Sequence, residues 1–218
     1  CSFELLSQVS GTGEQDSLNA LDELLSARMI VEIRNEARPY IISHDRVREV
    51  VYAQLSLARR QIFHRRAAFA LTEHKAPPVE LANHYAEAGD KEKAVEYLLK
   101  AGDDARGLYA YQEAIAAYQR ALALLNEIGD HEQTRVLAWK ASAQFALGKL
   151  FRFRGEFVTA LEWLAGAKEA RAKLEDTAGL AQVLIETGIA LHHKGDYGQV
   201  REVLNAGLAL AREVGDTR

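Results

Sequence analysis

The sequence predicts a mainly α-helical chain in two parts: a small N-terminal unit that contains a β-hairpin, and a longer α-solenoid built from helical hairpins. Two observations carry this prediction. Strong helix formers dominate the chain beyond Pro78, and no proline follows that residue. Glycine and alanine also recur there in a fixed register. The alternative, an ordinary helical bundle, does not require such a register.

Composition bounds the class of protein. The chain has 218 residues, 48% of them hydrophobic, which suffices for one or two packed cores, and its net charge of −4 gives no general attraction to nucleic acid or to an anionic membrane. No apolar run reaches the roughly eighteen residues that a membrane helix needs. The single cysteine, Cys1, excludes an internal disulfide and is typical of a reducing compartment, so we expect a cytoplasmic protein. Because the chain starts without Met inside a helical pattern, we expect a piece of a longer protein.

The N-terminal part combines helices with a β-hairpin. Its expected elements are helices at residues 3–9 and 16–27, β-strands at 29–34 and 39–43 joined by a turn at 35–38, and helices at 45–54 and 57–74. Ser56 is placed to cap the last of these helices. Helix, helix, hairpin and helix is the element order of a winged-helix domain. We place this domain at residues 1–76, with the Pro77-Pro78 pair marking its outer boundary.

Beyond this boundary the sequence repeats itself. The segments 87–101, 152–167 and 192–207 share a turn glycine, then a small or branched residue after five positions, a large apolar residue after four more and a small residue after a further three. These positions hold Gly89, Ala94, Leu98 and Ala101; Gly155, Ala160, Leu164 and Ala167; Gly195, Val200, Leu204 and Gly207; and, in a fourth unit, Tyr109 in place of glycine, Ala114, Tyr118 and Ala121. Because small residues let two helices press together, each unit predicts one helical hairpin.

This pattern resembles the tetratricopeptide repeat, whose second helix and turn it matches over most of residues 78–212. The resemblance implies that residues 77–218 form a right-handed α-solenoid of extended tetratricopeptide-like repeats, an array that we expect to continue past the end of the chain. The first-helix glycine of the family is matched in LGKLF (147–151) and TGIAL (187–191), whereas Gln144 and Leu184 stand where the family has tryptophan.

Repeat spacing in this chain is uneven, whereas that family has a regular period of roughly 34 residues. The matched positions are Ala94, Ala114, Ala160 and Val200, so the first step is much shorter than the two that follow. The short step predicts one long helix, at about residues 91–108, that serves as second helix of one hairpin and first helix of the next. The longer steps predict longer helices.

The stretch ISHDRVREVVYAQLSLARRQIFHRRAAFAL (42–71), followed by ELANHYAEAGDKEKAVEYLLKAGDDA (80–105), is similar to the region after the ATPase core in bacterial signalling ATPases of the STAND class, which include transcriptional regulators. In that class a nucleotide-binding domain precedes a winged helix and a superhelical repeat sensor. The resemblance implies a non-catalytic regulatory region of a signal-transducing ATPase. Its repeats would bind a protein or peptide partner, and its winged helix would relay that event to a nucleotide site in an upstream ATPase domain.

The Ser43-His44-Asp45 sequence also resembles the Met-His-Asp motif of related plant resistance and apoptotic ATPases, although Ser43 replaces the methionine. There the histidine contacts the β-phosphate of ADP, and the resemblance gives this nucleotide-sensing role to His44. The chain has no Walker loop to cradle phosphates, so it needs no cofactor itself, and ADP or ATP would bind to the full-length protein. The alternative is structural: Ser43 or Asp45 caps the next helix and His44 is a surface residue.

Resemblance to tetratricopeptide arrays also implies a concave, partner-binding face, lined by the first helix of each hairpin. By repeat position its residues are Asn83, Glu87, Asp103, Arg106, Lys149, Arg152, Phe153, Ile189, His192 and His193. Mixed charge with a few apolar residues suits a peptide or protein segment. Taken singly, each of these residues also fits a solvated side chain.

Direct nucleic-acid binding is not expected. In a DNA-binding winged helix the helix before the hairpin enters the major groove, and here it carries Asp16, Asp22 and Glu23 with no basic residue before Arg28. Carboxylates facing phosphates are unfavourable, and no counterion release compensates them. The arginines at 59, 60, 65 and 66 are interpreted as a solvated face or as a contact for the absent ATPase domain.

No catalytic or metal-binding set is recognisable. His192 and His193 point about 100° apart on a helix and cannot easily meet one metal ion together, so we expect no metal site. We therefore expect a non-enzymatic protein. Besides the ATPase-linked region, the alternative function is a free-standing tetratricopeptide scaffold or adaptor with no nucleotide linkage. A Walker loop upstream of Cys1 in the full-length protein would distinguish the two.

Overall fold

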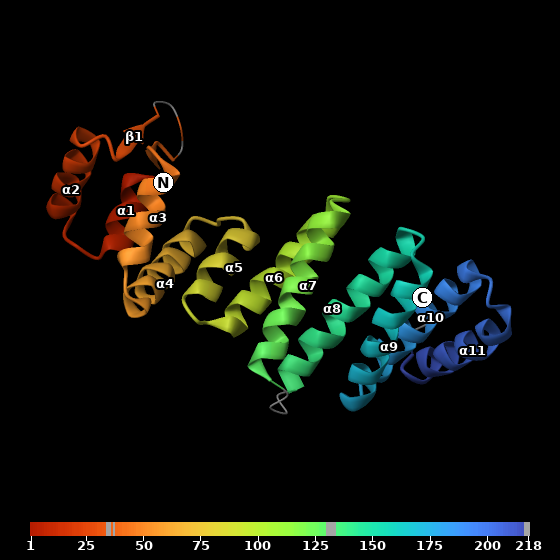
Figure 1. Ribbon diagram of the computed structural model, residues 1–218. Helices are drawn as coiled ribbons and strands as arrows, with labels where there is room; N and C mark the ends of the chain where they lie inside the picture. The colour runs from red at the N-terminus through yellow and green to blue at the C-terminus, as the bar shows by residue number, and fades with distance from the viewer. Residues whose placement is uncertain (34–35, 37, 130–133, 216–218) are drawn as a thin grey trace. The chain divides into compact units, whose positions relative to one another are not determined.

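The computed structural model describes residues 1–33, 36, 38–129 and 134–215, and divides into two compact units, Cys1–Ala94 and Val95–Arg218 (Figure 1). The elements of the described residues are α1 (Phe3–Ser10), α2 (Glu14–Ser26), β1 (Ile30–Glu32), β2 (Tyr40–Ile42), α3 (Asp45–Gln54), α4 (Leu57–Glu73), α5 (Pro78–Glu87), α6 (Lys91–Gly107), α7 (Tyr111–Ile128), α8 (Thr134–Phe153), α9 (Phe157–Lys173), α10 (Thr177–Lys194) and α11 (Tyr197–Glu213). Residues 34–35 and 37, which include the end of the first predicted strand and part of the predicted turn, lie outside the described residues.

The first unit has the element order that the sequence predicts. Strands β1 and β2 pair antiparallel, with Ile30 opposite Ile42 and Val31 opposite Ile41. Ser56 caps α4 as expected, because its side chain accepts a hydrogen bond from the backbone N–H of Arg59. Helix α5, which the sequence assigns to the first repeat, packs on α4 within this unit. The winged-helix domain at residues 1–76 stays a prediction.

Two arginines of α4 close the ends of other helices, which corrects the interpretation as a solvated face for Arg60 and Arg66, whereas Arg59 and Arg65 are exposed. The Arg60 guanidinium donates to the carbonyl oxygens of Leu55 and Ala53, at 3.1 and 3.4 Å, where α3 ends. That of Arg66 donates to the carbonyl oxygen of Ser10, the last residue of α1, at 2.7 Å. The last carbonyls of a helix lack partners within it and carry partial negative charge, so a cation is favourable there.

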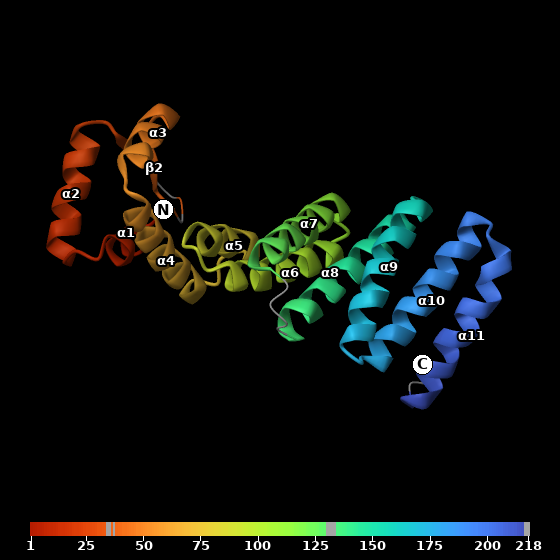
Figure 2. The ribbon, with the colours of Figure 1, turned by 60° about the horizontal axis from the view of Figure 1, so that its bottom comes forward.

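The second unit consists of antiparallel helices. Helix α6 is the single long helix predicted at 91–108, and α8, α9, α10 and α11 pack each on the next, as Figures 1 and 2 show. Repeat positions are buried: Ala114, Ala160 and Leu164 expose none of their surface. The helical-repeat architecture is therefore confirmed, whereas the right-handed sense of the solenoid stays a prediction. Of the helices described, none is both long and apolar enough to cross a membrane.

One contact recurs in the hairpins of the second unit. A Cβ atom added to Gly102, Gly148 or Gly188 would lie less than 3.0 Å from the side chain of, respectively, Tyr118, Leu164 or Leu204. The separation along the sequence is identical in the three pairs, so the same close approach is made at the same point of each hairpin. Gly148 and Gly188 are the first-helix glycines predicted from the repeat pattern, whereas Gly102 was not predicted.

Turns between paired helices use the left-handed backbone region. Gly155 and Gly195 have φ values of 79° and 88°, as the repeat pattern implies. Tyr109, which replaces the turn glycine between α6 and α7, adopts the same region with φ of 60°. For an ordinary L-residue this conformation costs about 1–2 kcal/mol. The packing of the repeat therefore outweighs the preference of the tyrosine backbone for negative φ.

Substituting Gly148 by alanine should test the recurring contact. Gly148→Ala forces a methyl group against Leu164, and overpacking of this kind costs about 1–3 kcal/mol. Gly198→Ala on α11 is the matched control, because a Cβ there meets no atom within 4 Å. Urea unfolding followed by Trp139 and Trp163 fluorescence should show a lower free energy of unfolding for Gly148→Ala and no loss for Gly198→Ala. Equal stabilities would contradict the contact.

Candidate partner-binding site

An ion-pair triad joins the first helices of two successive hairpins. Arg152 of α8 donates from Nε to Oε2 of Glu186 on α10, at 2.9 Å, and Lys149 Nζ lies 3.6 Å from Oε1 of the same carboxylate. The side chains of Arg152 and Glu186 are only 12% and 14% exposed, and that of Lys149 is 31% exposed. We call these three residues the Glu186 triad. Two of the predicted groove residues are thus engaged in holding one repeat against the next.

Glu186 was not among the predicted site residues. The repeat register that aligns Gly148 with Gly188 places Glu186 opposite Ala146, so no repeat position indicates an acid there. Its signal is different: it is a single acid within the apolar run VLIETGIAL (183–191), and a buried carboxylate needs a cationic partner. That requirement could have pointed to α8, where Lys149 and Arg152 stand at i and i+3.

Asp103 and Arg106 of α6 also contact each other. Arg106 donates to Oδ1 of Asp103 at 3.1 Å, and the Tyr118 hydroxyl of α7 donates to the same oxygen at 2.8 Å. Burial, together with this hydrogen bond to a carboxylate, raises the pKa of Tyr118, which therefore stays a hydrogen-bond donor throughout the neutral range. Since Tyr118 also covers Gly102, the polar cluster is part of the α6–α7 contact.

Four rings form a continuous row at the end of the second unit where α10 ends and α9 and α11 begin. Phe157 stacks on His193 with ring centroids 5.6 Å apart, His193 meets His192 edge to face at 5.7 Å, and His192 meets Tyr197 at 5.4 Å. We call Phe157, His193, His192 and Tyr197 the aromatic row. Tyr197 is 66% exposed, and both histidines are exposed. Three of the four aromatic rings, each of which carries a polar group, are therefore exposed to solvent.

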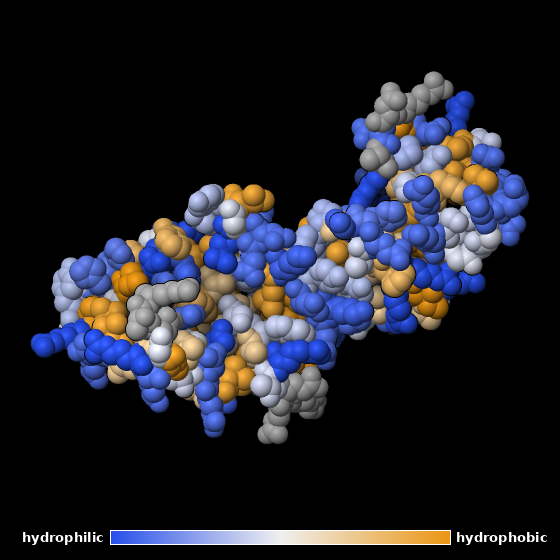
Figure 3. All heavy atoms as spheres, turned by 180° about the vertical axis from the view of Figure 1, so that it is seen from behind, coloured by the Kyte–Doolittle hydropathy of each residue, from blue (hydrophilic) through white to orange (hydrophobic). Residues whose placement is uncertain are grey.

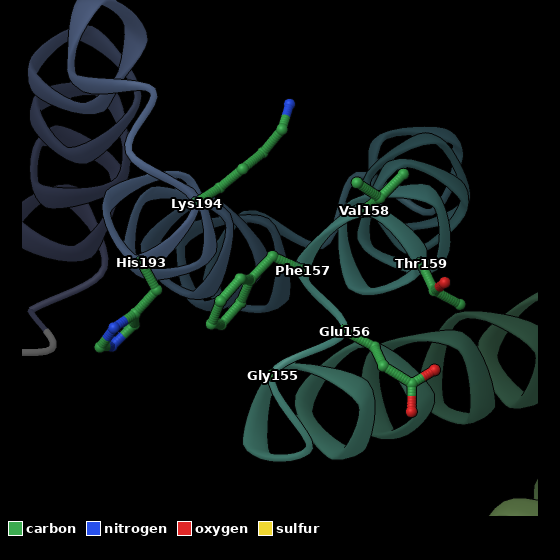
Figure 4. A pocket seen from close by; sticks show the side chains of 7 residues that line it. All are labelled: Gly155, Glu156, Phe157, Val158, Thr159, His193 and Lys194. Carbon is green, nitrogen blue, oxygen red and sulfur yellow. The ribbon is translucent and has the colours of Figure 1, made fainter.

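A shallow hollow of about 520 Å³ lies beside this row. It is lined by Gly155, Glu156, Phe157, Val158, Thr159, His193 and Lys194. Figure 4 shows the His193 and Phe157 rings side by side at its edge, with the Lys194 side chain extending away from them. Phe153, a predicted groove residue that is 61% exposed, ends α8 just before the hollow, and the guanidinium of Arg152 lies 4.3 Å from its ring centroid.

None of the remaining predicted groove residues is one of the four rings of the aromatic row. Ile189 is half-buried on α10, and Asn83 is exposed on α5. Glu87, at the end of α5, accepts a hydrogen bond from the Tyr52 hydroxyl of α3 at 3.3 Å. Among the described residues, no group of three or more histidine, cysteine, aspartate or glutamate side chains could hold a metal ion.

His44 occupies the N-cap position of α3 but makes no capping hydrogen bond with its side chain. Ser43 does not cap the helix either, since its hydroxyl donates to the carbonyl oxygen of Met29 at 3.0 Å. Asp45 is the first helical residue and pairs with Arg48 at 3.3 Å. The capping interpretation of Ser43 is therefore wrong. His44 is exposed, and its nucleotide-sensing role stays a prediction.

The β-hairpin and α3 of the first unit expose apolar side chains. The hairpin contributes Val31, Ile41 and Ile42, and α3 contributes Val50 and Val51, each between 41% and 53% exposed. Orange patches among the blue side chains of the N-terminal unit are visible in Figure 3. Clustered exposed apolar residues of this kind are typical of interaction surfaces.

Comparison with known proteins supports the fold and leaves the family open. No protein-family model matches the chain. It is 28% identical over 144 residues, 63% of this chain, to uncharacterized protein R02095 of Rhizobium meliloti (strain 1021), and it covers 14% of that protein's length. The apo form of RapI is a similar solved structure, with a TM-score of 0.54 and 14% identity, covering 98% of this chain and 55% of that one. The likeness to RapI shows a common helical-repeat fold.

Removing Arg152 should destabilise the second unit. Arg152→Ala leaves the Glu186 carboxylate largely buried without its close partner, and we expect the free energy of unfolding to fall by about 2 kcal/mol. Lys149→Ala is the control: its ammonium is farther from Glu186 and more exposed, so the loss should stay below about 1 kcal/mol. Urea unfolding measures both. Equal losses of stability in the two variants would show that burial does not strengthen the ion pair between Arg152 and Glu186.

Proposed function

We propose that the chain is a non-catalytic protein-interaction region whose second unit binds a segment of a partner protein at the aromatic row and the adjoining hollow. The observation that carries this proposal is the row itself: four rings from three helices, in mutual contact, three of them exposed. Aromatic side chains supply large contact areas with few rotatable bonds, and they are enriched among residues that dominate binding energies. The helical-repeat fold shared with RapI supports a scaffold of this kind.

Chemistry at the hollow favours a peptide that combines an apolar side chain with an acidic group. Phe157 and Val158 offer apolar surface, and Lys194 offers a cation at the C-terminal end of α10. Glu156 on the opposite side does not cancel this charge, because it pairs with Arg154 at 2.7 Å. The rest of the predicted groove contributes less, since the Glu186 triad and the Asp103 pair are occupied internally.

A second candidate function links the first unit to a nucleotide-binding domain of a longer protein. The exposed apolar residues of the hairpin and of α3 favour it, because a neighbouring domain would cover them. The far greater length of the relative from Rhizobium meliloti is consistent with such a neighbour. In this arrangement the repeats would bind the partner, and the first unit would transmit the event to the nucleotide site.

Peptides selected from a displayed library against the 218-residue chain should depend on the aromatic row. Tyr197→Ala and His193→Ala should each weaken binding about tenfold, equivalent to about 1.4 kcal/mol. Lys168→Ala, an exposed substitution on α9, is the matched control and should leave the dissociation constant unchanged. Isothermal titration calorimetry measures the affinities. Selected peptides that bind all three variants as well as the wild type would refute the proposed site.

His44→Ala tests the nucleotide linkage in the full-length protein. If His44 contacts the β-phosphate, the substitution should speed the release of bound ADP by about tenfold, as expected for loss of one charge-assisted hydrogen bond. His74→Ala, which removes an exposed histidine at the end of α4, is the control. Release is followed by stopped flow with a fluorescent ADP. Unchanged release would leave His44 as a surface residue and would favour the free-standing scaffold.

A further inference from the structure

Two histidines face each other between α4 and α5. Nδ1 of His64 lies 3.1 Å from Nδ1 of His84, and both side chains are partly buried. A neutral imidazole has one nitrogen that donates and one that accepts. At this distance one Nδ1 must therefore carry a proton and the other must be bare.

Neighbouring groups decide which histidine donates. The carboxylate of Glu87 can only accept a hydrogen bond, so the Tyr52 hydroxyl is the donor between them, at 3.3 Å. The Tyr52 oxygen then accepts from Nε2 of His64, at 3.0 Å. With its proton on Nε2, a neutral His64 has a bare Nδ1, and His84 must be the donor to it. The result is a directed chain from His84 through His64 and Tyr52 to Glu87, which connects α5, α4 and α3.

Protonation affects this chain in two unequal steps. A first proton can enter at Nε2 of His84, because His84 still donates from Nδ1 and every hydrogen bond survives. A second proton can enter only at Nδ1 of His64, the atom that accepts from His84. The two Nδ1–H groups would then point at each other as parts of two cations, and the contact at 3.1 Å could not persist.

The surroundings of the two histidines both lower and raise their pKa values. Burial lowers the pKa of His64 and of His84, and for His84 the neighbouring His64 lowers it further. The carboxylates of Glu87 and, for His84, Glu80 oppose this shift. The guanidinium carbon of Arg60, on α4, lies 4.7 Å from the centroid of the Tyr52 ring. Helix α1 also packs on α4, and its acidic residue Glu4 is exposed to solvent. Both imidazoles are therefore neutral at pH 7.

We propose that the chain of Glu87, Tyr52, His64 and His84 is an acid-sensitive latch, which holds α5 against α3 and α4 at neutral pH and releases it on double protonation. The direction follows from linkage. Because the folded pKa of each histidine is depressed, the unfolded or opened state binds protons first. The stabilisation is complete above the ordinary histidine pKa of about 6.5 and is lost as the pH falls through the lower, folded values. This inference does not depend on the partner-binding proposal.

Hydrogen–deuterium exchange on the 218-residue chain should detect the release. After correction for the intrinsic pH dependence of exchange, peptides from α4 and α5 should lose protection between about pH 7.5 and pH 5, a range that brackets the histidine pKa. Peptides from α9 to α11 serve as the internal control and should keep theirs. Nuclear magnetic resonance of the imidazole rings should show the two histidines titrating in two coupled steps, the second accompanying the loss of protection.

Substitutions separate the latch from general acid sensitivity. His84→Gln and His64→Gln cannot acquire a charge, so two cations cannot meet in either variant, and each should remove most of the pH dependence of exchange in α4 and α5. His74→Gln removes an exposed histidine of the same region and should retain it. Protection that is the same at both pH values in the wild type would overturn the latch. So would a pH dependence that is undiminished in either glutamine variant, and the wild-type comparison stands even if a variant fails to fold.

Discussion

The second unit depends on a close approach between a glycine on the first helix of each hairpin and a large side chain on the second. Gly148 against Leu164 and Gly188 against Leu204 make this contact in successive hairpins, and Gly102 against Tyr118 makes it once more. Any side chain on the glycine would separate the helices, and the buried alanines beside the contact would then leave voids. The spacing between helices in each hairpin therefore follows from one missing methyl group.

How far the sequence predicts this architecture depends on whether a feature is local. The hairpin and the Ser56 cap were predictable because each follows from adjacent residues, and the long helix from Lys91 was predictable because the repeat step there is short. Gly102 could not be predicted in the same way because α6 serves two hairpins, and the glycine directly follows the segment 87–101, which already matches the second-helix pattern. Tyr109 shows the limit of local preference, since its backbone takes the left-handed conformation that the repeat requires.

Long-range polar contacts could not be predicted from spacing. Arg66 of α4 reaches the end of α1, and Arg152 of α8 reaches Glu186 of α10, each across a long stretch of sequence. Neither sequence separation matches the spacing of the repeats. In addition, the sequence alone does not distinguish an arginine that binds the end of a helix from one that faces solvent. A physical rule does better than a pattern here: a buried carboxylate such as Glu186 must be paired, and the last carbonyls of a helix must find donors.

These internal pairs bear on where a partner can bind. Binding a ligand through a groove residue that already pairs with a neighbour is costly. A ligand that pairs with Arg152 in place of Glu186 leaves the partly buried carboxylate of Glu186 without its close partner. The aromatic row is free of this constraint: its rings contact one another and can be covered without breaking an ion pair. It also lies at the turn end of the hairpins, and none of its four residues takes part in the glycine contacts that set the helix spacing. Residues there can change without disturbing the packing, so the row is the place where specificity for a partner can vary while the scaffold stays the same.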